Sequence, residues 1–185
     1  MVSIAPKIET WKLDPSHTLV EFSAKHLMFS TVKGNFKNVD ATVDWDGADF
    51  TKSTVEAKIE VASLNTGDDK RDGHLHSADF LHVEEHPTLT FKSTHIEPVK
   101  DDEFRIIGDL TIRGITRPVT LDATFEGRGL SPWGTEVAAF TAKTSFNRKD
   151  FGLNWNVALE AGGVLVSEQV KIEIHAELIK QQAAA

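Results

Sequence analysis

Apolar and polar residues alternate along this chain, and this period of two constrains its fold more than any other feature. The alternation is clearest over residues 39–46, 55–61, 119–126 and 170–178. Side chains of a β-strand point alternately to opposite faces, so each stretch predicts a strand with one apolar and one wet face. Strands of this kind are typical of antiparallel sheets.

The same pattern recurs more weakly over residues 20–24, 89–91, 104–112 and 138–146. Turn signals separate the strands, and the longest of them is a loop over Gly127 to Gly134. About eight or nine one-sided strands need a common interior, which a sandwich or a closed barrel provides. Closure removes exposed edges, and a barrel of about eight strands has room for side chains alone or for one small ligand.

Two long connections interrupt the succession of strands, and connections of this length are often functional. The first runs from Ser63 to Pro87, and we expect a short helix around 72–81 with Asp72 as its N-cap. The second runs from Asn147 to Ser167 and is unusually apolar for a loop. Its apolar residues predict a cover over a barrel mouth, a dimer contact or an extra strand.

Composition limits the class of protein. We expect one domain over residues 1–185, with its core over about 11–178. The net charge of -8 argues against nucleic-acid binding and against docking on anionic membranes. No stretch is apolar enough to span a membrane, and no signal peptide is evident, so we expect a cytoplasmic protein. A processed or recloned form would also fit the periplasm.

Candidate chemistry is sparse. His82-Val83-Glu84-Glu85-His86 matches the H-x-x-E-H pattern of one class of zinc peptidases. Pro87 disfavours the helix that this chemistry needs, because a residue before proline is pushed out of the helical region. His74-Leu75-His76 offers two imidazoles without a third ligand. We therefore expect no enzyme, no metal ligands and no cofactor.

The chain carries the following segments in order: Leu13-Asp14-Pro15-Ser16-His17-Thr18, Phe22-Ser23-Ala24-Lys25-His26-Leu27, Val32-Lys33-Gly34-Asn35-Phe36, Arg71-Asp72-Gly73-His74-Leu75, Asp79-Phe80-Leu81, His86-Pro87-Thr88-Leu89-Thr90-Phe91, residues 108–121, Phe146-Asn147-Arg148-Lys149-Asp150-Phe151-Gly152-Leu153 and Trp155-Asn156. Taken together, these segments resemble the YceI-like family of lipid-binding proteins. The resemblance extends from about Trp11 to Leu178.

The resemblance implies an all-β fold, an antiparallel eight-stranded lipocalin-like barrel with one short helix in a long loop. It implies an apolar tunnel for an isoprenoid quinone, a polyprenyl (pyro)phosphate or a related lipid, and a homodimer. Within this frame we expect three sets of ligand-binding residues. They are a lining of Phe22, Phe36, Phe91, Leu110, Phe140 and Phe146, a lid of Phe80, Phe151 and Trp155, and head-group contacts at Arg71, His74 and Arg148.

Two other functions remain open on the sequence. A metal-dependent enzyme would use some of the eight histidines. An interaction module would have a barrel filled by its own side chains and no internal ligand. Our first hypothesis is non-enzymatic binding, storage or transport of the lipid.

Overall fold

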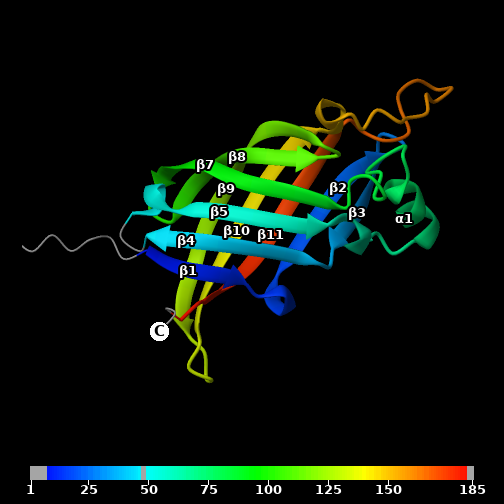
Figure 1. Cartoon of the computed structure of the whole chain (residues 1–185). Coiled ribbons are helices and arrows are strands. Elements are labelled where there is room, and N and C mark those ends of the chain that lie inside the picture. Colours follow the sequence, from blue (N-terminus) through cyan, green and yellow to red (C-terminus); the bar gives the residue numbers. More distant parts are fainter. Residues whose placement is uncertain (1–7, 47–48, 183–185) are drawn as a thin grey trace, which may run out of the picture.

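The computed structural model describes residues 8–46 and 49–182, and most of these residues lie in β-strands (Figure 1). The strands are β1 (Ile8–Leu13), β2 (Leu19–His26), β3 (Ser30–Phe36), β4 (Val39–Asp46), β5 (Thr54–Glu60), β6 (Leu64–Asn65), β7 (Thr88–Lys100), β8 (Glu103–Ile112), β9 (Ile115–Leu130), β10 (Glu136–Asn147) and β11 (Gln169–Lys180). The helices are α1 (Asp69–His76) and the short 3₁₀ turns η1 (Pro15–His17), η2 (Phe50–Lys52), η3 (Val61–Ser63) and η4 (Arg148–Phe151).

The strands form a closed antiparallel barrel. β1 and β2 both pair with β11 and act as one long strand that η1 interrupts. β3 and β4 likewise form one strand beside them, and β5 and β6 form the next. Counted in this way, the barrel has eight strands in chain order, and β1 closes it against β11 with Trp11 opposite Lys180. The predicted barrel is confirmed, and the sandwich is excluded.

Besides the two-residue β6, which the sequence assigns to a connection, β1 and β3 show no alternation in the sequence, and the structure shows why. Glu9 lies on the same face of β1 as the fully buried Trp11, where Lys180 contacts its carboxylate at 2.6 Å. Gly34 occupies a buried position of β3, and a Cβ there would lie 2.4 Å from the ring of Phe22. The charge of Glu9 therefore interrupts the apolar face of β1, and the missing side chain of Gly34 interrupts that of β3.

The predicted helix over 72–81 lies too far along the chain. Helix α1 begins at Asp69, and the side chain of Asp68 caps it by accepting a hydrogen bond from the N–H of Arg71. Asp72 lies inside the helix and is buried, because its carboxylate accepts bonds from the N–H and hydroxyl of Thr66. Turns, rather than helix, follow from Ser77 onward.

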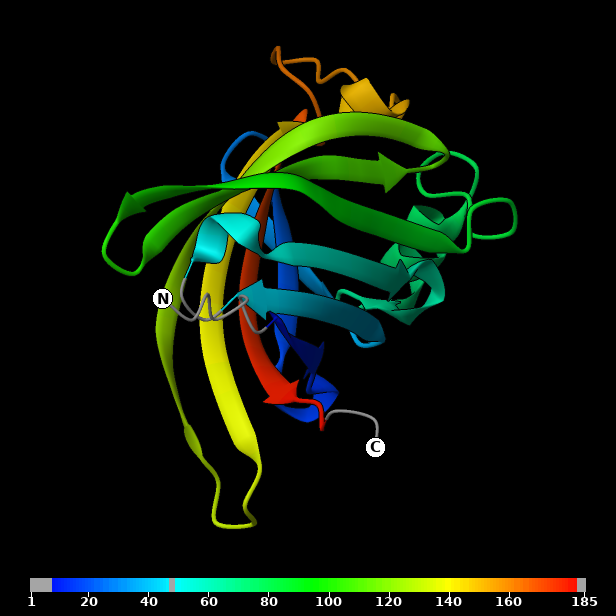
Figure 2. The ribbon, with the colours of Figure 1, turned by 60° about the vertical axis from the view of Figure 1, so that its left-hand side comes forward.

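The connection after β10 contains no extra strand among the described residues. It begins with η4, and Gly152 ends this turn in the left-handed region at φ 73°. Only isolated bridges follow, from His26 to Val166 and from Ala158 to Val164. The loop predicted over 127–134 is confirmed over 131–134 and wrong over 127–130, because β9 continues to Leu130 and forms with β10 the long hairpin that projects from the barrel (Figure 2).

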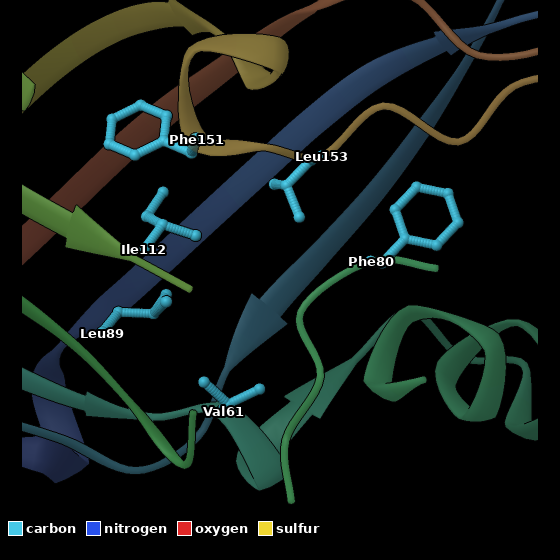
Figure 3. Close-up of a cluster of buried hydrophobic side chains, with 6 residues drawn as sticks. All are labelled: Val61, Phe80, Leu89, Ile112, Phe151 and Leu153. Carbon is cyan, nitrogen blue, oxygen red and sulfur yellow. The ribbon is translucent and has the colours of Figure 1, made fainter. Parts of the chain in front are cut away.

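Three clusters of buried apolar residues divide the barrel interior along its length. Trp11, Trp45, Ala138 and Leu178 lie at one end, and Ile96, Phe104, Ile106, Ala123 and Ala142 lie in the middle. The third cluster lies near α1 and joins strand ends to the two long connections (Figure 3). Its members are Val61, Phe80, Leu89, Ile112, Phe151 and Leu153.

Candidate ligand cavity

The inward faces of the strands surround a cavity of about 310 Å³. Small-molecule sites commonly measure roughly 300–1,000 Å³. Every second residue of β11 from Val170 to Leu178 lies on the cavity wall. At about 3.3 Å per residue, this wall is roughly 26 Å long. The cavity is therefore elongated, as a chain-like ligand requires.

The predicted lining residues all lie on the cavity wall, and none of them is fully buried. They are Phe22, Phe36, Phe91, Leu110, Phe140 and Phe146. Inward-facing apolar side chains of a filled barrel would be buried against one another. Here part of their surface faces empty space, and apolar cavities of this kind stay dry and take apolar guests. Whether these side chains bind a ligand stays a prediction.

Aromatic rings close the end of the barrel near η2. Phe50 stacks between Trp45 and Phe104, with ring centroids 5.3 and 5.1 Å away. Trp11 packs against Trp45 at 5.2 Å. The guanidinium of Arg128 covers both indole rings, 5.7 Å from the centroid of Trp11 and 5.3 Å from that of Trp45.

The rings of Trp11, Trp45, Phe50 and Phe104 form an aromatic plug. An ion-pair network lies outside this plug. Lys180 Nζ lies 2.6 Å from Glu9 and 2.9 Å from Glu136, and Arg128 pairs with the same Glu136. The hydrogen bond from Lys180 is the main reason that the pKa of Glu136 lies below its usual value. The network ties β1, β9, β10 and β11 together where the barrel closes.

The other end of the barrel is covered by α1, the turns over 77–87 and the connection over 148–167. Phe80 and Leu153 line the cavity from two of these segments, and Figure 3 shows both side chains among the buried residues at this end of the barrel. Trp155 packs on Phe80 at 5.4 Å, and Phe151 packs on Phe146 at 5.1 Å. Phe80 thus lies on the wall, whereas Phe151 and Trp155 stand behind it.

Arg148 is the charged residue on the cavity wall, and its side chain is almost fully buried at 2% exposure. Its guanidinium donates hydrogen bonds to the carbonyl oxygens of Leu153 (2.6 Å), Ser167 (2.9 Å) and Val166 (3.4 Å). Burial lowers the pKa of the group, although arginine stays charged in proteins. Arg148 therefore pins the covering connection while keeping a positive charge beside the cavity.

The other two head-group candidates lie off the cavity wall. Arg71 donates to the hydroxyl and the carbonyl of Thr66, so it holds the start of α1. His74 contacts Asp79 at 2.9 Å and stands edge-on to the rings of Phe80 and Trp155. Both lie on the covering segments, and contact with a ligand head group stays a prediction for each.

Two groups of side chains could hold a metal ion among the described residues. One is His82, Glu85 and His86, and the other is Asp14, His17 and Glu177. The first group coincides with the H-x-x-E-H motif, and the prediction that no helix spans it is confirmed. His74 and His76 belong to neither group, and His76 is hydrogen-bonded to the carbonyl oxygen of Val61 at 3.0 Å.

A closed eight-stranded antiparallel barrel with one plugged end, one covered end and an apolar interior belongs to the class of β-barrels that enclose a cavity. The chain belongs to the YceI-like domain family within this class, because the family profile matches residues 11–178. A UPF0312 protein of Staphylococcus aureus is 40% identical over 165 residues, which are 89% of this chain and 94% of the relative.

Solved structures share the fold. The YceI protein of Campylobacter jejuni superposes with a TM-score of 0.74 at 30% identity, over 85% of this chain and 90% of that one. BcnA of Burkholderia cenocepacia superposes with a TM-score of 0.77 at 24% identity, over 89% of this chain and 98% of that one. A polyisoprenoid binding domain from Saccharophagus degradans superposes with a TM-score of 0.63 at 14% identity, over 92% of this chain and 98% of that one. This last likeness shows the fold alone. Within the described ranges, no helix is long and apolar enough to cross a membrane.

Proposed function

We propose that this protein binds a long apolar lipid of the isoprenoid class in its barrel and holds or carries it without covalent chemistry. The observation that carries the proposal is the set of six inward-facing side chains, from Phe22 to Phe146, whose exposed surface faces an elongated cavity. The printed description of the Saccharophagus domain, which names polyisoprenoid binding, supports the same class of ligand.

The free energy of burial is large enough for such a ligand. Each buried CH₂ group contributes about 0.8 kcal/mol, so a tail equivalent to about twenty groups gives roughly 16 kcal/mol. Association and ordering cost about 4–15 kcal/mol and offset most of this gain. The remainder supports binding that depends on the length of the tail rather than on its detailed structure.

The polarity of the wall favours a tail inside the barrel and a head group at the covered mouth. Most polar groups of the wall are single hydroxyls, such as those of Ser53, Thr141 and Thr144, which offer little to a charged head group. Arg148 adds positive charge near the covering segments, and the aromatic plug blocks the other end. An isoprenoid quinone or a polyprenyl (pyro)phosphate fits this arrangement.

A cavity-filling variant tests the proposal. Ala57 lies on the wall, so Ala57→Trp should occupy the space of the tail. Ala139 lies off the wall on β10, and Ala139→Trp adds the same ring outside the barrel. Delipidated proteins would be incubated with a long-chain isoprenoid quinone, and the quinone that co-elutes in gel filtration would be measured.

We expect the wild type and Ala139→Trp to retain the quinone and folded Ala57→Trp to lose most of it. Equal retention by both folded variants would place the lipid outside the barrel and contradict the proposal. Circular dichroism and thermal melting would establish that each variant is folded.

A further inference from the structure

A tight turn directly follows Phe80 and Leu81, the residues with which the 77–87 segment lines the cavity. The N–H groups of Glu85 and His86 both donate to the carbonyl oxygen of His82, at 3.1 and 2.9 Å. Side chains three and four positions apart share one side of such a turn. Pro87 prevents a longer helix, yet one turn suffices to bring the two imidazoles together.

The ligand atoms of this turn converge. His82 Nδ1 lies 3.5 Å from Glu85 Oε2, and His86 Nε2 lies 4.0 Å from the same oxygen. One donor atom from each of the three residues lies within 4.8 Å of the other two. A tetrahedral Zn²⁺ ion with bonds of about 2.1 Å holds its ligands roughly 3.4 Å apart. Small side-chain rotations would therefore bring all three onto one ion.

The two imidazoles are available for a ligand. Among the described residues, His82 and His86 make no side-chain hydrogen bond, and their only ion-pair contacts are these longer ones to Glu85. His17, His74 and His76 differ, because each has a ring nitrogen within 2.8–3.0 Å of an oxygen. The side chains of His82 and His86 are 23% and 30% exposed, so an ion can reach them from solvent.

The backbone of the turn is also unusual. His82 adopts φ 52°, in the left-handed region that residues with a side chain seldom occupy. The ring of His86 packs beside Gly114 of the β8–β9 turn, where a Cβ would lie 3.1 Å from the imidazole. Packing against a second turn fixes the position of one ligand before an ion arrives.

We propose that His82, Glu85 and His86 form a binding site for a divalent transition-metal ion, with Zn²⁺ as the best match. Two imidazole nitrogens and one carboxylate oxygen favour zinc, nickel or copper over magnesium and calcium, which prefer oxygen ligands. Three protein ligands leave a coordination position free for water or an anion. The proposal departs from the sequence-based expectation of no metal ligands and is independent of lipid binding.

The second group, Asp14, His17 and Glu177, is the competing site that the experiment must separate. It supplies a single imidazole, and Asp14 already accepts hydrogen bonds from Ser16 and His17 at 2.6 and 2.8 Å. Its ligand atoms are therefore used in holding η1. We expect weaker binding of zinc there.

Calorimetric titration of untagged, EDTA-treated protein with Zn²⁺ tests the site. We expect one ion per chain, with affinity reduced about tenfold or more in both His82→Ala and His86→Asn. His17→Ala removes the competing imidazole, and His95→Ala removes an imidazole that has only Glu97 beside it. Both controls should bind Zn²⁺ as the wild type does, and thermal melting would check each fold.

NMR of the wild type gives a second readout that needs no variant. Zn²⁺ should shift the imidazole nitrogen signals of His82 and His86 and leave those of His95 and His175 unchanged. Loss of binding in His17→Ala alone, unchanged affinity in folded His82→Ala, or no zinc-dependent shift at His82 would each overturn the proposal.

Discussion

Asp14 holds the break between β1 and β2. Its carboxylate accepts hydrogen bonds from the N–H and hydroxyl of Ser16 and contacts His17 Nδ1 at 2.8 Å. The bond with His17 is the largest cause that lowers the pKa of Asp14 from 3.8 to about 2. A carboxyl whose pKa is lower in the folded state stabilises the fold above its unfolded pKa, and this contribution disappears as the pH falls through the folded pKa.

Replacement of Asp14 should therefore have a pH-dependent effect. Asp14→Ala should lower the free energy of unfolding by about 1 kcal/mol near neutral pH, as expected for a lost cap. The difference in unfolding free energy between the wild type and Asp14→Ala should become smaller between about pH 4 and pH 2, where the wild-type carboxyl takes up its proton. Urea unfolding at several pH values measures it, with Asp40→Ala as the exposed control. A difference in unfolding free energy that does not change with pH would contradict this account.

Gly108 allows two strands to approach beside a register shift. A Cβ at this position would lie 2.5 Å from both the carbonyl oxygen of Lys92 and the ring of Phe91. Gly108→Ala should thus lower stability by about 1–3 kcal/mol through overpacking. Gly129 has no atom within 4 Å of its Cβ position, so Gly129→Ala should be neutral or stabilising by up to about 1 kcal/mol. Equal effects in chemical denaturation would show that the close approach is not the cause.

One buried charged side chain, that of Arg148, ties together the two ends of the 148–167 connection. Arg148 donates hydrogen bonds to the carbonyl oxygens of Leu153, Val166 and Ser167, and Asn156 adds hydrogen bonds to Val157 and Val166 within the same connection. The neighbouring Lys149 points outward and pairs with Glu168 at the surface, with both side chains 45% exposed. The two neighbours therefore offer a matched test of the cover.

Loss of the Arg148 anchor should loosen the cover more than it disturbs the barrel. Arg148→Met should cost about 3 kcal/mol, because hydrogen bonds to charged groups contribute about 1.5–3 kcal/mol. Hydrogen exchange should accelerate over 152–167 and stay slow in β9–β11. Lys149→Met should change stability by less than about 1 kcal/mol. Uniform acceleration across the barrel would argue against a local anchor.

The strands that the sequence predicts are those with an uninterrupted apolar face, such as β4, β5 and β11. The sequence pattern does not predict β1 and β3, because Glu9 and Gly34 occupy inward positions where the pattern requires an apolar side chain. The start of α1 is misplaced because Asp72 resembles a cap by type, while its carboxylate is used by Thr66. Which acidic residue caps a helix depends on tertiary contacts, and these are not visible in a local pattern.

The six lining residues could be placed on the wall from the alternation and the family resemblance together. The aromatic plug could not be predicted, because Phe50 and Arg128 come from segments without a strand pattern. The convergence of His82 and His86 is also hidden in the sequence, because the H-x-x-E-H pattern predicts a metal site only on a helix, and Pro87 disfavours that helix. A turn that brings the same residues together has no distinct sequence signal.

At the scale of the whole molecule, closure of β1 on β11 leaves an interior that its own side chains do not fill. The homodimer that the family resemblance implies stays a prediction, which sedimentation velocity would test. The apolar cavity accounts for the Phe-rich interior, because phenylalanine has no polar tip to satisfy in a dry space.

Organic extraction of freshly purified protein, followed by mass spectrometry, tests the central claim most directly. The account predicts a nearly stoichiometric isoprenoid or a similar long-chain lipid in the extract. A clean extract, obtained again after incubation with isoprenoid quinones and polyprenyl phosphates, would contradict lipid binding and favour an interaction module with no internal ligand.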